Sequence, residues 1–160
     1  MRTPSVLLAG AALLATGAGF AADQRPAASA PQKPAATPMV VYKSPTCGCC
    51  SAWIEHVRAR GLQVDANNVS DSQLNVIAIQ SGVPGDLVTC HTAKVGGYIV
   101  EGHVPAEDIL RMLKEKPAIA GIAVAGMPLG SPGMEQGGVK QPFSTMAFTK
   151  DGKTTVFARH

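Results

Sequence analysis

The sequence has 160 residues, a length that fits one domain and leaves no room for a second full core. Its formal net charge is only +3, and no basic stripe interleaved with aromatic residues is present, which argues against nucleic-acid binding. Three of its four cysteines lie within residues 47–50 and the fourth is Cys90, so the spacing argues against two long-range disulfides. At most one disulfide links a cysteine of residues 47–50 to Cys90; alternatively, Cys47 pairs with Cys50.

The first 22 residues are typical of a secretory signal peptide. Arg2 gives a positive start, residues 6–20 are apolar and rich in small side chains, and residues 19–22 offer a small-residue cleavage site. The apolar stretch is shorter than the roughly 20 residues of a membrane-spanning helix, although an uncleaved anchor is the alternative. We therefore predict a periplasmic protein with no membrane segment in the mature form.

The next segment, residues 23–38, has four prolines and no large apolar side chain. Such a segment cannot bury enough surface to offset the entropy of ordering. We predict a disordered linker at residues 23–38 and a single folded domain at residues 39–160.

The first half of this domain alternates between strand and helix patterns. A strand at residues 39–43 leads into the cysteines, and a helix starting there ends at Gly61. A second strand is expected at residues 62–69. A second helix follows, with Asp71 as its expected N-cap and its end at Gly82.

The second half begins with a hairpin at residues 89–100 that turns at Gly96 and Gly97. A third helix has Pro105 at its first position and stops at Pro117. The remainder comprises an apolar run at 119–124, a Gly/Pro/Met loop at 126–138 and a terminal hairpin at 143–157.

This element order predicts an α/β fold. With a C-x-x-C motif at the start of the first helix, it is the order of a thioredoxin-like domain, in which a parallel first strand pair meets an antiparallel second pair. The expected architecture is a thioredoxin-like mixed sheet with an extra C-terminal loop and β-hairpin.

The cysteine motif carries the chemistry. Cys47 and Cys50 form C-x-x-C at a helix N-terminus, where free N–H groups and the helix dipole favour thiolate. Disulfide exchange needs only two thiols, so the extra Cys49 is better explained by metal ligation. Soft thiolates select Cu(I) or zinc, and zinc is disfavoured because Cys90 and His91 make a poor second ligand pair.

The methionines fall into two groups. Met127 and Met134 lie in the Gly/Pro-rich loop, where no periodicity requires a large apolar side chain, and thioether ligation of copper would account for them. Met112 and Met146 fit helix and strand patterns and are expected in the core.

Other candidates have simpler explanations. Cys90 is equally well explained as a buried thiol, a disulfide partner or a ligand. His91 follows it on an expected strand, so we expect it on the opposite face, at the surface. His56 is about 10 Å along the helix from Cys49 and is expected to be solvated. Trp53 is expected to pack beneath the cysteine turn.

Four blocks of the sequence occur in an order that points to a family. They are SPTCGCC at 44–50, CHT at 90–92, GYIVEGHVP at 97–105 and GMPLGSPGME at 126–135. Together they resemble the small periplasmic metal-binding family of CopG-type copper-resistance proteins over residues 39–160. The resemblance implies a thioredoxin-like domain with a C-x-C-C copper site, able to hold several ions, and interconversion of Cu(I) and Cu(II).

The resemblance also favours Cys90 and His103 as ligands. The expected metal ligands are Cys47, Cys49, Cys50, Cys90, His103, Met127 and Met134. The expected partners are a copper ion and other periplasmic copper-handling proteins.

Three hypotheses follow. The first is a periplasmic copper-binding protein that holds Cu(I), with copper oxidoreductase activity as an open question. The second is a thiol-disulfide oxidoreductase in which Cys47 attacks and Cys50 resolves the mixed disulfide. The third is a structural module stapled by zinc.

Overall fold

The computed structural model of the protein describes residues 37–160. The predicted signal peptide at residues 1–22, and the predicted linker up to residue 36, lie outside the described residues. The first strand begins at Pro38, one residue before the predicted start of the domain.

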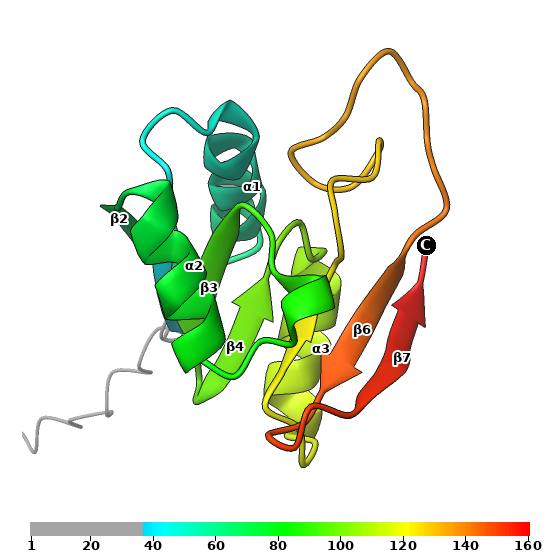
Figure 1. Ribbon diagram of the computed structural model, residues 1–160. Helices are drawn as coiled ribbons and strands as arrows, with labels where there is room; N and C mark the ends of the chain where they lie inside the picture. The colour runs from blue at the N-terminus through cyan, green and yellow to red at the C-terminus, as the bar shows by residue number, and fades with distance from the viewer. Residues whose placement is uncertain (1–36) are drawn as a thin grey trace, which may run out of the picture. The chain divides into compact units, whose positions relative to one another are not determined.

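A mixed β-sheet runs through the described part of the chain (Figure 1). Its strand order is β2-β1-β3-β4-β5-β6-β7, with β1–β2 and β4–β5 parallel and the other neighbours antiparallel. The strands are β1 (Pro38–Lys43), β2 (Gln63–Asn68), β3 (His91–Val95), β4 (Tyr98–Glu101), β5 (Gly121–Ala123), β6 (Ser144–Phe148) and β7 (Thr154–Arg159).

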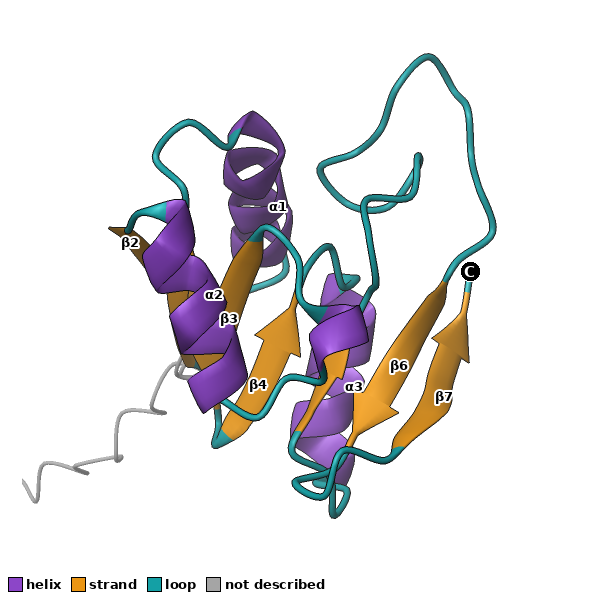
Figure 2. Ribbon diagram, in the orientation of Figure 1, coloured by secondary structure: helices purple, strands orange, loops and turns teal. Residues whose placement is uncertain are grey.

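Helices cover both faces of this sheet, as Figure 2 shows. They are α1 (Gly48–Ala59), α2 (Asp71–Gln80) and α3 (Ala106–Glu115), with a short 3-10 turn, η1 (Gly85–Leu87), after α2. Apolar residues of α1 and α3 pack into one buried cluster with β1, β3 and β5. Ala78 of α2 belongs to a separate cluster, which includes Phe148 of β6. Helices α1 and α3 therefore lie on one face and α2 on the other.

Helix α1 forms because its apolar residues recur on one side. Cys50, Trp53, Ile54 and Val57 are all buried, at the spacing that gives a helix one apolar face. The helix ends before Gly61, whose φ of +91° is a conformation that glycine adopts without steric cost. The predicted end of this helix is therefore confirmed.

The starts of the other two helices differ by one residue from the prediction. The N-cap of α2 is Ser70, not Asp71, because Ser70 and Gln73 form a reciprocal capping box. Pro105 is the N-cap residue of α3 rather than its first residue, and it provides no side-chain hydrogen bond. The free N–H groups at the start of α3 therefore need a hydrogen-bond acceptor from another part of the chain.

The expected α/β architecture is confirmed. The parallel pair β1–β2 meets the antiparallel hairpin β3–β4 through β1 and β3. The C-terminal loop and hairpin are also present, and β5 joins this hairpin to the sheet at β4. Within residues 37–160, none of the helices has the length and apolar character to cross a membrane.

Candidate metal centre

The cysteine motif lies where β1 passes into α1. Cys47 is the N-cap residue of α1, and its Sγ accepts the N–H of Cys50 at 3.2 Å. A sulfur therefore occupies the place of the usual hydroxyl or carboxylate cap, at the positive end of the helix dipole. Here the side chains of Cys47, Cys49 and Cys50 gather within one helical turn.

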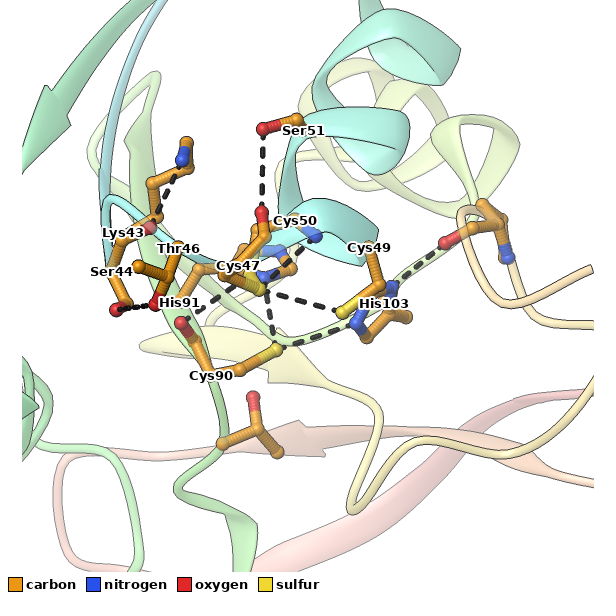
Figure 3. The surroundings of a disulfide bond; sticks show 12 residues. Lys43, Ser44, Thr46, Cys47, Cys49, Cys50, Ser51, Cys90, His91 and His103 are labelled. Carbon is orange, nitrogen blue, oxygen red and sulfur yellow. Dashed lines mark hydrogen bonds between the residues drawn. A yellow bond between two sulfur atoms is a disulfide. The ribbon is translucent and has the colours of Figure 1, made fainter.

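Cys47 and Cys50 form a disulfide, with 5.4 Å between their Cα atoms, whereas Cys49 and Cys90 are free thiols (Figure 3). The Sγ atoms of Cys47 and Cys49 are 3.4 Å apart. All four sulfurs lie within 4.8 Å of one another. We call these four residues the cysteine cluster. The distant Cys90, which the spacing alone left open, is thus part of it.

Cys90 lies in the bend just before β3, and two histidine side chains approach its sulfur. Its Sγ is 3.3 Å from His103 Nε2 and 3.4 Å from His91 Nδ1. Burial, and then the nearby Cys49 thiol, raise the pKa of the Cys90 thiol to about 12. The free thiol is therefore protonated at neutral pH, and a metal ion must displace its proton to bind.

His103 is held in one orientation. It is fully buried, and its Nδ1 donates a hydrogen bond to the carbonyl oxygen of Pro132 at 2.8 Å. The neutral ring then has its lone pair on Nε2, the nitrogen that faces Cys90. Burial lowers the pKa of His103, which favours this neutral form. A ligating histidine commonly has its other ring nitrogen fixed by such a carbonyl.

The prediction that His91 lies at the surface is wrong. His91 is fully buried, between Trp53 at 4.3 Å and His103 at 5.2 Å between ring centroids. Side chains alternate between the two faces of a sheet only within a strand. Because β3 begins at His91, Cys90 lies in the preceding bend, and its position does not determine the face on which His91 lies. Burial lowers the pKa of His91 to about 3, and its Nε2 has no hydrogen-bond partner.

The two candidate methionines differ in exposure. Met127 is 54% exposed, whereas Met134 is half-buried. Met134 directly follows Gly133, whose backbone lies against Cys49 and Trp53 of α1. The loop therefore approaches the start of α1 next to Met134. Ligation by either methionine stays a prediction.

The remaining predictions have mixed outcomes. Trp53 and Met112 are fully buried in the core, as expected for packing residues, while Met146 is half-buried against the second apolar cluster. His56, expected to be solvated, is half-buried, and its Nε2 accepts the N–H of Ala106 at 3.1 Å. The prediction failed because a helical pattern does not show which neighbouring backbone a side chain can reach.

Glu101 is a buried carboxyl group beside the centre, and its role was not apparent from the sequence motifs. Its Oε1 accepts the N–H of Thr89 at 2.8 Å, while Oε2 has no hydrogen-bond partner. Burial raises the pKa of Glu101 to about 7, against the opposing effect of the Thr89 N–H. Its place in the block with His103 is the sequence signal that could have identified it.

A cavity of about 430 Å³ reaches Cys90. It is bordered by polar side chains of Ser44, Asp71 and Asn75. A larger cavity of about 1010 Å³ includes none of the predicted ligands. Cys90 is therefore approachable from the side of α2.

The donor atoms fit a soft metal ion. Two groups overlap at Cys90, one of four sulfurs and one that adds the nitrogens of His91 and His103. Thiolate sulfur with imidazole nitrogen suits Cu(I) and zinc, whereas magnesium and calcium prefer oxygen. In the disulfide form only Cys49 and Cys90 can become thiolates. Use of all four sulfurs as thiolates therefore requires reduction of the Cys47–Cys50 bond.

Comparison with known proteins places this centre in a family context. A family model described as "Protein of unknown function, DUF411" matches residues 87–134, and no curated protein matches the sequence. Two solved structures, described as "Copper resistance protein copG- Form 2" and "Form 1", are each 38% identical to the chain. The matches have TM-scores of 0.72 and 0.71, and cover 78% and 77% of this chain and 98% and 96% of those chains.

Proposed function

Because the chain belongs to the family of the copper resistance protein CopG, we propose that it is a periplasmic copper-binding protein that holds Cu(I). The observation that carries the proposal is the convergence of four sulfurs within 4.8 Å of one another, three from the start of α1 and one from Cys90. Thiolates are soft ligands that favour Cu(I). The signal-peptide pattern of residues 1–22 supports a periplasmic location.

In this proposal the two histidines add nitrogen donors to the cysteine cluster. His103 directs Nε2 toward Cys90 because Nδ1 is held by Pro132. His91 brings Nδ1 to the same sulfur. Met127 and Met134 are weaker candidate ligands, whose loop contacts α1 through Gly133. The overlap of the sulfur and nitrogen groups at Cys90 supports occupancy by more than one ion.

The proposal includes interconversion of Cu(I) and Cu(II) in copper resistance. Bound copper supplies one-electron chemistry, and imidazole accommodates both ions while thiolate favours the reduced one. The chain contributes the reduced cysteines. A dithiol reductant gives two electrons and two protons to the Cys47–Cys50 disulfide, which becomes two thiols while the dithiol itself becomes a disulfide. Export would bring this centre together with other periplasmic copper-handling proteins.

The test is an anaerobic Cu(I) titration of the reduced protein, with metal analysis. We expect copper uptake, and a loss of affinity of about tenfold or more, or roughly 1.4 kcal/mol, in each of Cys47→Ser, Cys49→Ser and Cys50→Ser. Competition with zinc in the same titration separates this proposal from the zinc-bound structural module, which would bind zinc in preference to Cu(I). If the wild-type protein takes up no more copper than a variant lacking all four thiols, the proposal is wrong.

A thiol-disulfide oxidoreductase is the second candidate function, and the Cys47–Cys50 disulfide favours it. The Sγ of Cys47 caps the helix, where an attacking thiolate is stabilised. This function predicts that disulfide exchange with a model dithiol is lost in Cys47→Ser but barely changed in Cys49→Ser. The copper proposal predicts instead that Cys49→Ser impairs the protein as strongly as Cys47→Ser.

A further inference from the structure

We propose that His56 is a positioning residue of the metal centre, which ties the segment carrying His103 to the helix that carries the cysteines. The inference rests on the proposed function, since it concerns how a ligand of that centre is held. His56 does not reach the cysteine cluster itself. It acts on the backbone three residues beyond His103, at Ala106.

The contact is a helix cap supplied by another helix. The Nε2 atom of His56 in α1 accepts the N–H of Ala106, the first residue of α3, at 3.1 Å. The N-cap of α3 is Pro105, which offers no side-chain hydrogen bond. Ala106 is fully buried, so its N–H would be left without a partner if His56 were apolar.

A second side chain of α1 holds the same segment. Trp53 Nε1 donates to the carbonyl oxygen of Val104 at 2.8 Å, and both side chains are fully buried. Trp53 and His56 therefore fix the backbone on either side of Pro105. Since His103 immediately precedes Val104, these two bonds determine how its backbone lies relative to α1.

The imidazole ring of His103 is held by a different segment, the C-terminal loop. Its Nδ1 donates to Pro132 in the C-terminal loop, and its Nε2 is 3.3 Å from Cys90 Sγ, an approach visible in Figure 3. The backbone of His103 thus follows α1, while its ring is oriented by the loop. Loss of the His56 contact would let the segment shift and move Nε2 away from Cys90.

The charges around His56 favour the neutral ring that this contact needs. Burial, and then Arg60 on the same helix, lower the pKa of His56, against the opposing effect of Glu135 in the loop. On the facing helix, Glu107 forms an ion pair with Arg60. A neutral ring leaves Nε2 free to accept a hydrogen bond.

The test compares two variants at this position. His56→Gln keeps an acceptor that can reach the Ala106 N–H, whereas His56→Leu removes it. We expect the Cu(I) affinity of the reduced protein to fall about tenfold in His56→Leu and to stay within about twofold of wild type in His56→Gln. If His56→Leu fails to fold, His56→Ala, which leaves room for water at Ala106, takes its place.

A double-mutant cycle with His103→Ala separates positioning from general stability. If His56 acts through His103, removing the His56 acceptor in the His103→Ala background causes no further loss of affinity. X-ray absorption of the copper-loaded protein should also show less copper–nitrogen scattering in His56→Leu than in His56→Gln.

The outcomes distinguish the two claims. Failure of the wild-type protein to take up Cu(I) contradicts the proposed function, and the inference falls with it. If the wild type takes up Cu(I) normally, two results contradict only the role of His56. One is additive losses in the cycle, and the other is unchanged affinity in whichever acceptor-deleted variant folds.

Discussion

Cys47 has two structural roles, because the same sulfur is bonded to Cys50 and caps α1. Reduction of the disulfide leaves a thiol or thiolate at the cap, where the helix N–H groups stabilise negative charge. The helix cap and the proposed metal ligand are thus the same sulfur atom. His103 likewise has one contact with two effects. The hydrogen bond from Nδ1 to the Pro132 carbonyl orients the ring and also selects its neutral tautomer.

His56 gives a prediction for the pH dependence of stability. Burial holds its folded-state pKa below the ordinary histidine value of 6.5, so the unfolded chain binds the proton more readily. The stabilisation is fully present above pH 6.5 and is lost as the pH falls through the lower folded-state pKa. We expect the urea midpoint of the metal-free protein to fall less between pH 7.5 and pH 5 in His56→Gln than in the wild type.

The control in that comparison is internal. His91 and His103, whose pKa values are also lowered, are present in both proteins, so the difference between the two profiles reports His56 alone. Parallel profiles for the wild type and His56→Gln would contradict this assignment.

Contacts between elements connect the C-terminal loop with α1. The backbone of Gly133 lies so close to α1 that an added Cβ would be 2.6 Å from Cys49 O and 2.8 Å from Trp53 N. Its φ of +84° also disfavours any side chain. The glycine therefore allows a close contact between the loop with Met134 and the helix that carries the cysteines.

Substitution of this glycine should loosen the loop. We expect Gly133→Ala to destabilise the protein by about 1–3 kcal/mol, because backbone strain and a clash with α1 combine. Gly126→Ala is the matched control: its φ is +68°, yet nothing lies within 4 Å of the added Cβ. Urea unfolding checks this difference, and equal losses in the two variants would show that the contact with α1 is unimportant.

Across the whole described region, the C-terminal hairpin is tied to the helix layer as well as to the sheet. Asp108 of α3 is buried and accepts hydrogen bonds from Thr145 Oγ1 at 2.6 Å and His160 Nε2 at 2.9 Å. These bonds connect α3 to β6 and to the residue after β7. The hairpin is therefore an integral part of the fold.

This connection predicts the effect of a nearly isosteric change. Thr145→Val removes the hydroxyl donor from the buried Asp108 carboxylate, and we expect a loss of about 1–3 kcal/mol in the free energy of unfolding. Thr145→Ser, which retains the hydroxyl, should lose less. Denaturant unfolding measures both. A Thr145→Val protein as stable as the Ser variant would mean that the hydroxyl bond contributes nothing.

The sequence by itself determined the three helices, the extra thiol and every strand except β5, which was only an apolar run, because these features depend on local periodicity, turn residues and cysteine spacing. Gly96 and Gly97 mark the hairpin turn, and Cys49 distinguishes the motif from a two-cysteine redox turn. The N-cap of α2 was not determined by the sequence, because two adjacent residues suit that position. Ser70 caps the helix through a capping box with Gln73, although Asp71 also suits an N-terminus.

Only the tertiary structure decided which distant groups meet. Cys90 joins the cysteine motif because β3 pairs with β1, which brings the residue before one strand beside the turn after the other. The burial of His91 and the reach of His56 to Ala106 depend likewise on elements packed across the fold. Local periodicity specifies the elements; the positions of their side chains around a shared centre follow from long-range packing.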